Sequence, residues 1–423
     1  MMTSSFSGFY KLSPAERMEK VVAETGISEE EAKKIAEPSL SVDLADKMVE
    51  NVIGTYTLPM GVALNFKING EDVIIPMVTE EPSVIAAASN AAKMARPSGG
   101  FTTSFTGSIM IAQVQMVDVA APGYARNVIL EHKAEIEKIC NEKDPVLVKF
   151  GGGFHDLDVR LVDSKVGTMV IVHLLVNVGD AMGANAVNSM AEAVAPYIEQ
   201  ITGGKAYLRI LSNLATYRLA RARVRVRKED LSKEKDPKDG ANIVNKIIEA
   251  YAFAAADPYR AATHNKGIMN GITAAVMATG NATRAIESGA HAYAAMKGRY
   301  TSLTVWEKDE NGDLVGSIEI PMAVGLVGGA TKTHPGAKVA VKILGVKTAA
   351  ELAQIYAAVG LAQNLAAIKA LATEGIQRGH MKLHARTVAA SVGAEGEALE
   401  QIVKQMISDG NVNVEYAKEL MSK

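Results

Sequence analysis

Hydrophobic and polar residues alternate with a period of two in several short runs, which is the pattern of half-buried strands. The first two runs, at 63–68 and 72–78, are separated by Asn69 and Gly70, a pair that favours a compact hairpin turn. Further strands are predicted at 107–119, 157–162, 168–178, 207–210 and 219–227. A helical pattern over 184–199 ends at Gly203 and Gly204.

Three capping boxes mark helix starts, because each places a glutamate three residues after a serine or threonine: 13–16, 28–31 and 348–351. The N-terminal region is therefore predicted to be helical. The third box opens an alanine- and leucine-rich helix that runs to residue 373. Gly375 and Gly379 then interrupt the pattern before two short helical stretches, which predicts a separate C-terminal subdomain.

Arginine alternates with apolar residues over 219–227, and two interpretations of this stripe are open. It is either a basic groove for nucleic acid or the solvated face of a strand. We favour the solvated face and expect no nucleic acid partner, because 45 basic and 47 acidic residues leave a formal net charge of only −2. The lysine-rich segment 228–238 is predicted to be a solvated loop.

Composition indicates a globular protein of two or three domains, since 423 residues exceed one ordinary core and 48% are hydrophobic. The single cysteine, Cys140, cannot form a disulfide within the chain, so we expect a cytoplasmic location. The first ten residues do not resemble a secretory signal. The apolar segment 169–178 is too short to span a bilayer, so we expect no membrane association.

The usual nucleotide-binding, serine-hydrolase and zinc-protease motifs are missing from the sequence: G-x-G-x-x-G, G-x-x-x-x-G-K-[ST], G-x-S-x-G and H-E-x-x-H. Any dinucleotide site must therefore be unconventional. Residues 180–185 lie at a predicted strand-to-helix junction. Free backbone N–H groups and the helix dipole at such a junction favour an anion such as pyrophosphate.

Two further segments carry candidate chemistry. Residues 257–271 place Lys266 between a His-Asn pair and a Gly-Ile-Met-Asn-Gly run, where a cation could be held against a polarised carbonyl. Residues 374–380 place His380 behind glycines that could act as hinges. Together the two segments indicate carbonyl chemistry with a movable proton donor.

With these segments the chain resembles the class II branch, bacterial and archaeal, of hydroxymethylglutaryl-CoA reductase over nearly its whole length. The matching blocks are 50–54, 80–83, 99–103, 180–185, 264–267 and 375–380. The family reduces a thioester to an alcohol with two nicotinamide hydrides, through a hemithioacetal and an aldehyde. The products are free CoA and mevalonate, a precursor for isoprenoid biosynthesis, so the resemblance implies an oxidoreductase acting on hydroxymethylglutaryl-CoA, or on mevalonate plus CoA in reverse.

The resemblance implies three catalytic residues. Lys266 would stabilise the negative charge that each hydride places on the carbonyl oxygen. Glu81 would be the acid that protonates this oxygen. Without the resemblance, Glu81 fits equally well as a carboxylate that stabilises a helix N-terminus. His380 would protonate the departing CoA thiolate. Without the resemblance, we would interpret it as a surface histidine near a helix end.

One position departs from the family, because Ala282 stands where the family has an aspartate beside the catalytic lysine and glutamate. A methyl group cannot accept a hydrogen bond, so Lys266 is expected to lose its orientation and its proton coupling to Glu81. Losing one such group typically costs ~10²- to 10⁴-fold in rate. The chain is therefore expected to be a strongly impaired reductase, or a ligand-binding, catalytically silent variant of the same fold.

The resemblance also implies binding residues. Asp144 would accept hydrogen bonds from the adenosine ribose 2′-hydroxyl and repel a 2′-phosphate, which favours NADH over NADPH, although Asp144 and Pro145 also fit an ordinary turn. The other dinucleotide positions are Asp180, Met182, Gly183, Asn185 and Asn213. The hydroxymethylglutaryl portion would be held by Ser83, Arg260 and Asn270.

The remaining histidines are expected to pack or to form hydrogen bonds, because their spacing does not suit metal ligands. These are His155, His173, His291 and His334. We therefore expect no metal. His384 lies four residues after His380, on the same face of a helix, where it could contact CoA.

By resemblance, the fold is α/β (α+β), with a large discontinuous domain at 1–106 and 214–374. A small ferredoxin-like, non-Rossmann dinucleotide-binding domain is inserted at 107–213, and a C-terminal helical flap follows at 375–423. The family also forms homodimers, with residues 50–54 near the interface and active sites shared between subunits. An acyltransferase acting on a CoA thioester is the competing enzyme class.

Overall fold

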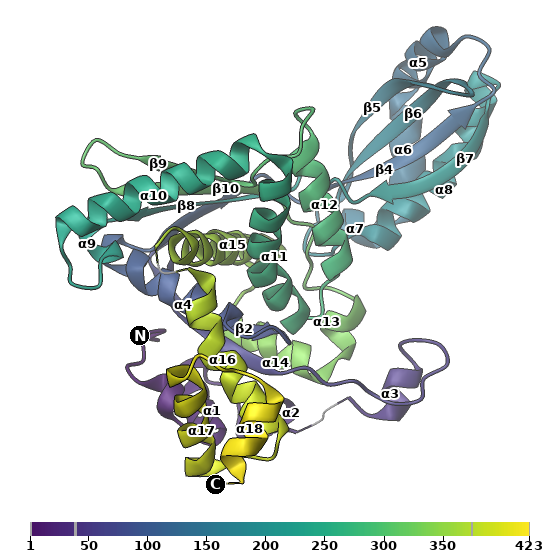
Figure 1. Ribbon diagram of the computed structural model, residues 1–423. Helices are drawn as coiled ribbons and strands as arrows, with labels where there is room; N and C mark the ends of the chain where they lie inside the picture. The colour runs from purple at the N-terminus through teal and green to yellow at the C-terminus, as the bar shows by residue number, and fades with distance from the viewer. Residues whose placement is uncertain (1, 38–39, 374, 423) are drawn as a thin grey trace.

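The structure is a computed structural model that describes residues 2–37, 40–373 and 375–422, with the backbone alone for residues 376–383. Its described part contains two β-sheets, surrounded by helices of very different lengths (Figure 1). The mixed helix-and-sheet class expected from the sequence is confirmed.

The larger sheet joins two distant stretches of the chain. Its strand order is β2-β1-β3-β8-β10-β9. The strands are β1 (Met60–Ile68), β2 (Glu71–Val78), β3 (Phe101–Phe105), β8 (Leu219–Val226), β9 (Thr304–Lys308) and β10 (Leu314–Pro321). The predicted hairpin between β1 and β2 is confirmed, with Asn69 and Gly70 at φ of 50° and 92°. Antiparallel pairing of β3 with β8 connects the segments before and after the second sheet.

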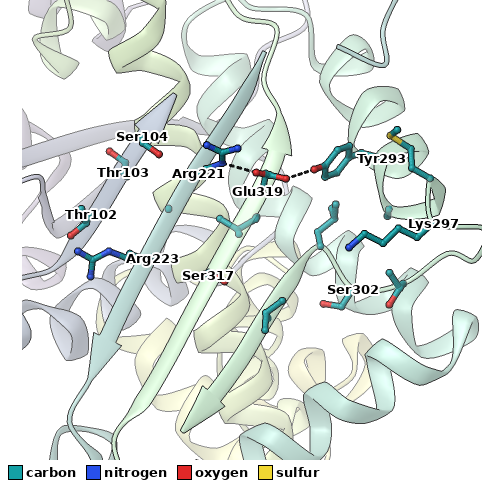
Figure 2. Close-up of a pocket in the computed structure, with 17 residues that line it drawn as sticks. Thr102, Thr103, Ser104, Arg221, Arg223, Tyr293, Lys297, Ser302, Ser317 and Glu319 are labelled. Carbon is teal, nitrogen blue, oxygen red and sulfur yellow. Dashed lines mark hydrogen bonds and ion pairs between the residues drawn. The ribbon is translucent and has the colours of Figure 1, made fainter. Parts of the chain in front are cut away.

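The arginine stripe on β8 is the outward face of this sheet. Ala220, Ala222, Val224 and Val226 are buried, while Arg221, Arg223 and Arg225, which alternate with them, are exposed. Arg221 Nε donates to Glu319 Oε2 at 2.5 Å (Figure 2). Arg225 Nη2 lies 2.7 Å from Asp313 Oδ2. The solvated-face interpretation is therefore confirmed, and partner acids on β10 and the turn before it neutralise two of the arginines.

The smaller sheet has the strand order β5-β6-β4-β7, and each neighbouring pair is antiparallel. Its strands are β4 (Ile109–Val117), β5 (Gly153–Ser164), β6 (Gly167–Asn177) and β7 (Lys205–Ser212). Its helices are α5 (Pro122–Glu131), α6 (Lys133–Lys143), α7 (Pro145–Lys149) and α8 (Ala184–Thr202). The chain order β-α-β-β-α-β is the ferredoxin-like arrangement expected from the resemblance. This unit projects away from the rest of the molecule (Figure 1).

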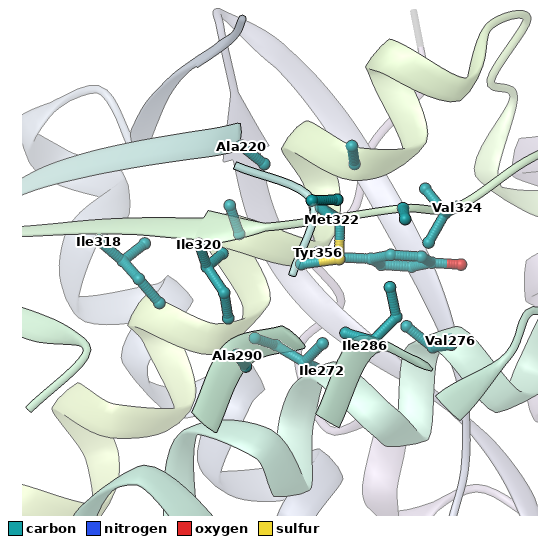
Figure 3. Close-up of a cluster of buried hydrophobic side chains, with 14 of the residues drawn as sticks. Ala220, Ile272, Val276, Ile286, Ala290, Ile318, Ile320, Met322, Val324 and Tyr356 are labelled. Atoms are coloured by element: carbon teal, nitrogen blue, oxygen red, sulfur yellow. The ribbon is translucent and has the colours of Figure 1, made fainter. Parts of the chain in front are cut away.

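The long helix α15 (Ala349–Ala372) lies at the centre of the larger unit, where it packs on the inner face of the six-stranded sheet and against three further helices. These are α4 (Val84–Ala95), α10 (Pro237–Ala256) and α11 (Pro258–Ala278). Tyr356 of α15 is fully buried among apolar side chains of α11, α12 (Thr283–Ala295) and β10, and its hydroxyl lies 2.6 Å from Thr279 Oγ1 (Figure 3).

Glycines allow α11 and α15 to approach closely. A Cβ atom on Gly271 would lie 2.9 Å from the Gln363 side chain, and one on Gly360 would lie 2.7 Å from Ile272. By length and composition α15 could cross a membrane, and 67% of its most apolar window is buried inside the protein. It is therefore a core helix, and it is longer than the apolar segment 169–178 singled out from the sequence.

The remaining elements are short helices and the C-terminal cluster. The N-terminal part contains η1 (Phe9–Lys11), α1 (Pro14–Thr25), α2 (Glu29–Ala36), α3 (Val42–Asp46) and η2 (Arg96–Ser98). Later elements are α9 (Lys228–Leu231), α13 (Gly329–Thr333), α14 (Pro335–Leu344), α16 (Ile376–Ser391), α17 (Gly396–Ser408) and α18 (Val414–Met421). Both N-terminal capping boxes, at Ser13 and Ser28, are confirmed.

Three local predictions were wrong. The lysine-rich segment is not a plain solvated loop, because buried Asp230 in α9 accepts hydrogen bonds from Arg227 and Lys235. The described C-terminal part contains three helices instead of two, and α16 continues through Gly379. The third capping box is wrong only in part: Thr348 caps α15 by accepting from Glu351 N at 3.2 Å, but the Glu351 side chain accepts from the N–H of Lys347 instead of that of Thr348.

We predict that Gly316→Ala destabilises the fold by about 1–3 kcal/mol, because overpacking forces rigid neighbours to move. A Cβ atom at Gly316 would lie 2.2 Å from the ring of buried Trp306, its cross-strand partner. The measurement is the free energy of unfolding in urea. The control is Gly123→Ala in α5, where no atom lies within 4 Å. If both variants unfold at the same denaturant concentration, the packing argument is wrong.

Candidate active site

The rotation of α11 about its axis determines where Lys266 points. Asn265 is fully buried, where it donates to Thr301 O at 2.8 Å and accepts from Leu303 N at 3.0 Å. Successive side chains on a helix are about 100° apart, so fixing Asn265 in the core turns the next residue outward. Lys266 is accordingly 59% exposed, which leaves its ammonium group accessible to a ligand.

Glu81 reaches Lys266 from the turn between β2 and α4. Its backbone N–H donates to Thr79 Oγ1 at 3.1 Å, and Ser83, at φ of 75°, forms the N-cap position of α4. Lys266 Nζ donates to Glu81 Oε2 at 2.6 Å, and Asn270 Nδ2, one helical turn along α11, donates to Glu81 Oε1 at 3.2 Å. Both carboxylate oxygens are therefore held.

Ala282 lies far from this pair within one chain. It forms the N-cap position of α12, is exposed, and provides no side-chain hydrogen bond to the helix. From Lys266, α11 continues to Ala278, which is about 18 Å along the helix axis. Within the single chain Glu81 orients Lys266, and the loss of orientation expected from Ala282 stays a prediction.

The junction between β6 and α8 has the features expected of an anion site. Gly183 is the N-cap of α8 at φ of 95°, and a Cβ atom there would lie 2.6 Å from the Val178 side chain. Gly183 has no side chain to bond the first N–H groups of α8, so a ligand can take this role. Met182 is half-buried and Asn185 is exposed beside these groups, whereas Asp180 Oδ1 accepts from Ala349 N at 2.7 Å.

Buried Arg218, which the sequence analysis missed, ties this junction to the loop after β10. Its guanidinium donates to Ala181 O at 3.0 Å, Met182 O at 3.1 Å and Val324 O at 2.5 Å. Burial lowers the pKa of Arg218 to about 10, against the opposing charge of Asp180. Arg218 lies outside every motif and directly precedes a strand with several other arginines. Nothing in the local sequence therefore distinguished it as a buried residue.

The same loop reaches Ala282. Gly325 N donates to Asn281 Oδ1 at 2.8 Å, and Leu326 N donates to Asp180 O at 2.8 Å. Position 282 is therefore coupled to the β6–α8 junction, and not to the Lys266 end of α11. The nearby exposed Asn213 lies against α12, where a Cβ atom on Gly289 would lie 2.5 Å from Asn213 O.

Asp144 has a local structural role. Its Oδ1 accepts from Leu147 N at 2.9 Å, which makes Asp144 the N-cap of α7 instead of part of an ordinary turn. Its other carboxylate oxygen has no hydrogen bond to a described residue, so a ribose contact stays a prediction. Arg260 is half-buried in the first turn of α11, and its backbone N–H is capped by Asp257 Oδ1 at 2.8 Å.

The structure supports ordinary roles for most histidines. His173 lies 2.9 Å from Gln113, His291 contacts Tyr300 and Glu287, and His334 caps α14. His155 is exposed on β5. No cluster of three potential metal ligands occurs among the described residues.

His380 lies in α16, but its side chain is outside the described residues, so its predicted position is not tested. His384 is exposed on the same helix. The roles of His380 and His384 toward CoA therefore remain predictions from the sequence.

The comparison with known proteins now decides the family. The sequence model described as hydroxymethylglutaryl-coenzyme A reductase matches residues 13–385. The chain belongs to the hydroxymethylglutaryl-coenzyme A reductase family. A curated 3-hydroxy-3-methylglutaryl-coenzyme A reductase of Archaeoglobus fulgidus is 58% identical, covering 100% of this chain and 95% of the relative. A probable reductase of Borreliella burgdorferi is 36% identical over 82% of this chain and 78% of the relative.

Solved structures of class II reductase from Streptococcus pneumoniae have the same fold. One is 43% identical, with a TM-score of 0.85 and coverage of 99% of both chains. Another, described as bound to NADPH in open conformations, has a TM-score of 0.84 and covers 87% of this chain and 100% of the other. The class II reductase resemblance is thus confirmed.

We predict that His264 makes the reductase fold sensitive to acid. Burial, together with the positive charge of Arg260, lowers the pKa of His264 to about 4. As pH falls below about 6.5, the unfolded chain binds a proton that the folded chain does not, so the free energy of unfolding decreases. Between about pH 7 and pH 5 the native chain should lose about 2 kcal/mol more than His264→Gln. The measurement is urea unfolding across this range.

His155→Gln is the control, because His155 is exposed. It should follow the native pH dependence. Equal slopes for the native chain and His264→Gln would contradict the assignment.

Proposed function

We propose that this chain catalyses the NAD(P)H-dependent reduction of hydroxymethylglutaryl-CoA to mevalonate and free CoA. The observation that carries the proposal is the accessible ammonium of Lys266, 2.6 Å from Glu81. Hydride transfer to a carbonyl carbon develops negative charge on the oxygen, which a preorganised cation stabilises. Glu81, held in place by Lys266 and Asn270, is assigned as the general acid for that oxygen. Both of its carboxylate oxygens accept hydrogen bonds in the structure, so Glu81 takes up a proton before it donates one.

The substrate carboxylate is assigned to Arg260, with Ser83 and Asn270 completing the hydroxymethylglutaryl site. A guanidinium suits a carboxylate because it donates two parallel hydrogen bonds. Arg260 and Asn270 lie on α11 with Lys266, and Ser83 follows Glu81 in the same turn. The acid group and the reacting carbonyl of one small substrate can therefore be held by one helix and one turn.

The nicotinamide dinucleotide is assigned to the β6–α8 junction. Asp180, Met182, Gly183 and Asn185 surround the first turn of α8, and Asn213 lies nearby on the loop after β7. The bound group supplies the hydride. NADH is the proposed partner rather than NADPH, because the free oxygen of Asp144 suits a ribose 2′-hydroxyl and repels a 2′-phosphate. A much lower Michaelis constant for NADPH would contradict this preference.

The remaining assignments follow the family. His380 in the proposed C-terminal flap, 375–423, protonates the CoA thiolate, and His384 contacts CoA. The proposed large domain comprises 1–106 and 214–374, and the dinucleotide domain comprises 107–213. No metal takes part, and the proposed location is the cytoplasm.

A homodimer is needed to complete this site. The dinucleotide junction and position 282 lie at one end of α11, whereas Lys266 and Glu81 lie about 18 Å away along its axis. We therefore assign the nucleotide and position 282 of one subunit to the Lys266 site of its partner. Residues 47–59 form no helix or strand and stand off from the body (Figure 1), with Ile53 and Tyr56 fully exposed. An apolar segment of this kind suits a subunit contact.

Ala282 makes this chain an impaired enzyme. A carboxylate at the N-terminus of α12, contributed by the partner subunit, would accept a hydrogen bond from Lys266 and share its proton with Glu81. The alternative function is a ligand-binding, catalytically silent protein, and the same alanine favours it. Cofactor oxidation with hydroxymethylglutaryl-CoA present separates the two, and an acyltransferase would release CoA without consuming NADH.

We predict that Ala282→Asp raises turnover by at least about tenfold, because general acid–base groups contribute ~10²- to 10⁴-fold. The measurement is NADH oxidation at saturating hydroxymethylglutaryl-CoA. Ala282→Asn is the control, since an amide keeps the size but not the charge. An unchanged rate in Ala282→Asp would remove position 282 from the mechanism.

We further predict complementation between subunits. The parent chain is co-expressed with the double variant Ala282→Asp and Lys266→Met. The parent homodimer lacks the carboxylate at position 282, and the homodimer of the double variant lacks the ammonium at position 266. Heterodimers should recover about a quarter of the Ala282→Asp rate, because half of the random pairs carry one complete site. Mixtures without activity, with heterodimers verified by two affinity tags, would place position 282 in the site of its own chain.

A further inference from the structure

A cavity of about 720 Å³ opens on the outer face of the six-stranded sheet. Its floor is formed by β3, β8 and β10, and its wall by the end of α12 and the segment that follows (Figure 2). Lys266 lies on α11, which packs with α15 on the opposite face of the sheet. The cavity is therefore separate from the proposed active site.

Three arginines of β8 face this side of the sheet, and two of them are neutralised. Arg221 pairs with Glu319, and Arg225 pairs with Asp313. Arg223, between them, lines the cavity and has no hydrogen bond or ion pair with a described residue. The sheet register explains the difference, because the β10 residue opposite Arg221 is Glu319 and the residue opposite Arg223 is Ser317.

Hydroxyl groups flank this unpaired arginine on both neighbouring strands. Thr102 of β3 and Ser317 of β10 lie directly opposite Arg223 in the register. Both side chains are exposed in the cavity, and neither hydroxyl bonds a described residue. Neighbouring strands are about 4.8 Å apart, so the row presents a hydroxyl, a guanidinium and a second hydroxyl within the reach of one oxyanion.

A second cation faces the row from the opposite wall. Lys297 follows α12 and extends toward the strands (Figure 2). It makes no hydrogen bond or ion pair with the described residues. The charge of Glu319, the acid that lines the cavity, is already shared, because Tyr293 and Arg221 hydrogen-bond to it. Lys297 is also close enough to Glu319 to interact with it electrostatically. The cavity therefore has three cations, Arg221, Arg223 and Lys297, facing one acid.

We propose that this cavity binds a small molecule with two anionic groups, phosphate or carboxylate. One group binds Arg223 and the hydroxyls of Thr102 and Ser317, and the other faces Lys297. Guanidinium and hydroxyl donors suit the oxygen atoms of either group. The volume is in the range of small-molecule sites, ~300–1,000 Å³.

The test is calorimetric titration of the full-length protein at low ionic strength with inorganic pyrophosphate and, separately, with malonate. Saturable binding with a dissociation constant on the order of 1 mM or below is expected for at least one probe. The stronger probe identifies the anion as phosphate or carboxylate. Arg223→Gln and Lys297→Gln should each weaken this binding by about tenfold or more.

Arg225→Gln is the matched control, because Arg225 lies on the same strand and face but outside the cavity lining. It should change the affinity by less than about twofold. The proposed nucleotide site also attracts phosphate. Binding at the cavity is therefore measured as the difference in probe binding between the parent chain and Arg223→Gln. NADH binding, which reports on the proposed function, should be the same in all of these variants.

Three results would overturn the proposal. The first is that neither probe shows saturable binding, and the second is equal weakening by Arg225→Gln, which would indicate a general effect of charge. The third is conversion of a dimer to a monomer by Arg223→Gln in sedimentation, which would make this face a contact between copies of the chain.

Discussion

The ion pair between Lys266 and Glu81 is the interaction on which the functional account depends. It joins α11 to the β2–α4 turn, two parts of the chain separated by 185 positions. A lysine that pointed freely into solvent would be a mobile charge, and orienting it during the reaction would cost free energy. Held by Glu81 and supported through Asn270, the ammonium is already placed where a carbonyl oxygen can approach it.

The core makes this placement possible. Asn265 locks the rotation of α11 through the Thr301–Leu303 segment, and close contacts at Gly271 and Gly360 press α11 against α15. At the other end, Arg218 holds the β6–α8 junction and the loop beside Asn281 as one assembly. The helix thus separates the end proposed to bind the carbonyl from the end proposed to bind the nucleotide. The proposed dimer, with these ends opposite each other, would let residues so far apart serve one reaction.

Local patterns in the sequence predicted the elements that depend on local physics. The Asn69–Gly70 hairpin, the caps at Ser13 and Ser28, and the alternation along β8 all follow from turn geometry, hydrogen bonding of helix ends and strand periodicity. The ferredoxin-like arrangement was expected only from the family resemblance, because pairing between β4 and β6 depends on contacts distant in sequence.

The predictions that failed concern features that depend on contacts between distant parts of the chain. The lysine-rich segment folds around buried Asp230, and Arg218 is important because of three carbonyls contributed by remote loops. Neither set of contacts produces a recognisable pattern in the neighbouring sequence. The distance between Ala282 and Lys266 also could not be predicted from the motif, which gives the identity of residues but not the length of helix between them. By contrast, the pairing of Lys266 with Glu81, inferred from the resemblance, agrees with the observed geometry.

Hydride transfer in a single turnover tests the role of Lys266 most directly. In the Ala282→Asp background, Lys266→Met should slow the transfer of hydride to bound hydroxymethylglutaryl-CoA by about 10²- to 10³-fold, while the affinity for NADH stays unchanged. A loss of less than about threefold at full occupancy of both ligands would show that the ammonium does not stabilise the developing oxyanion.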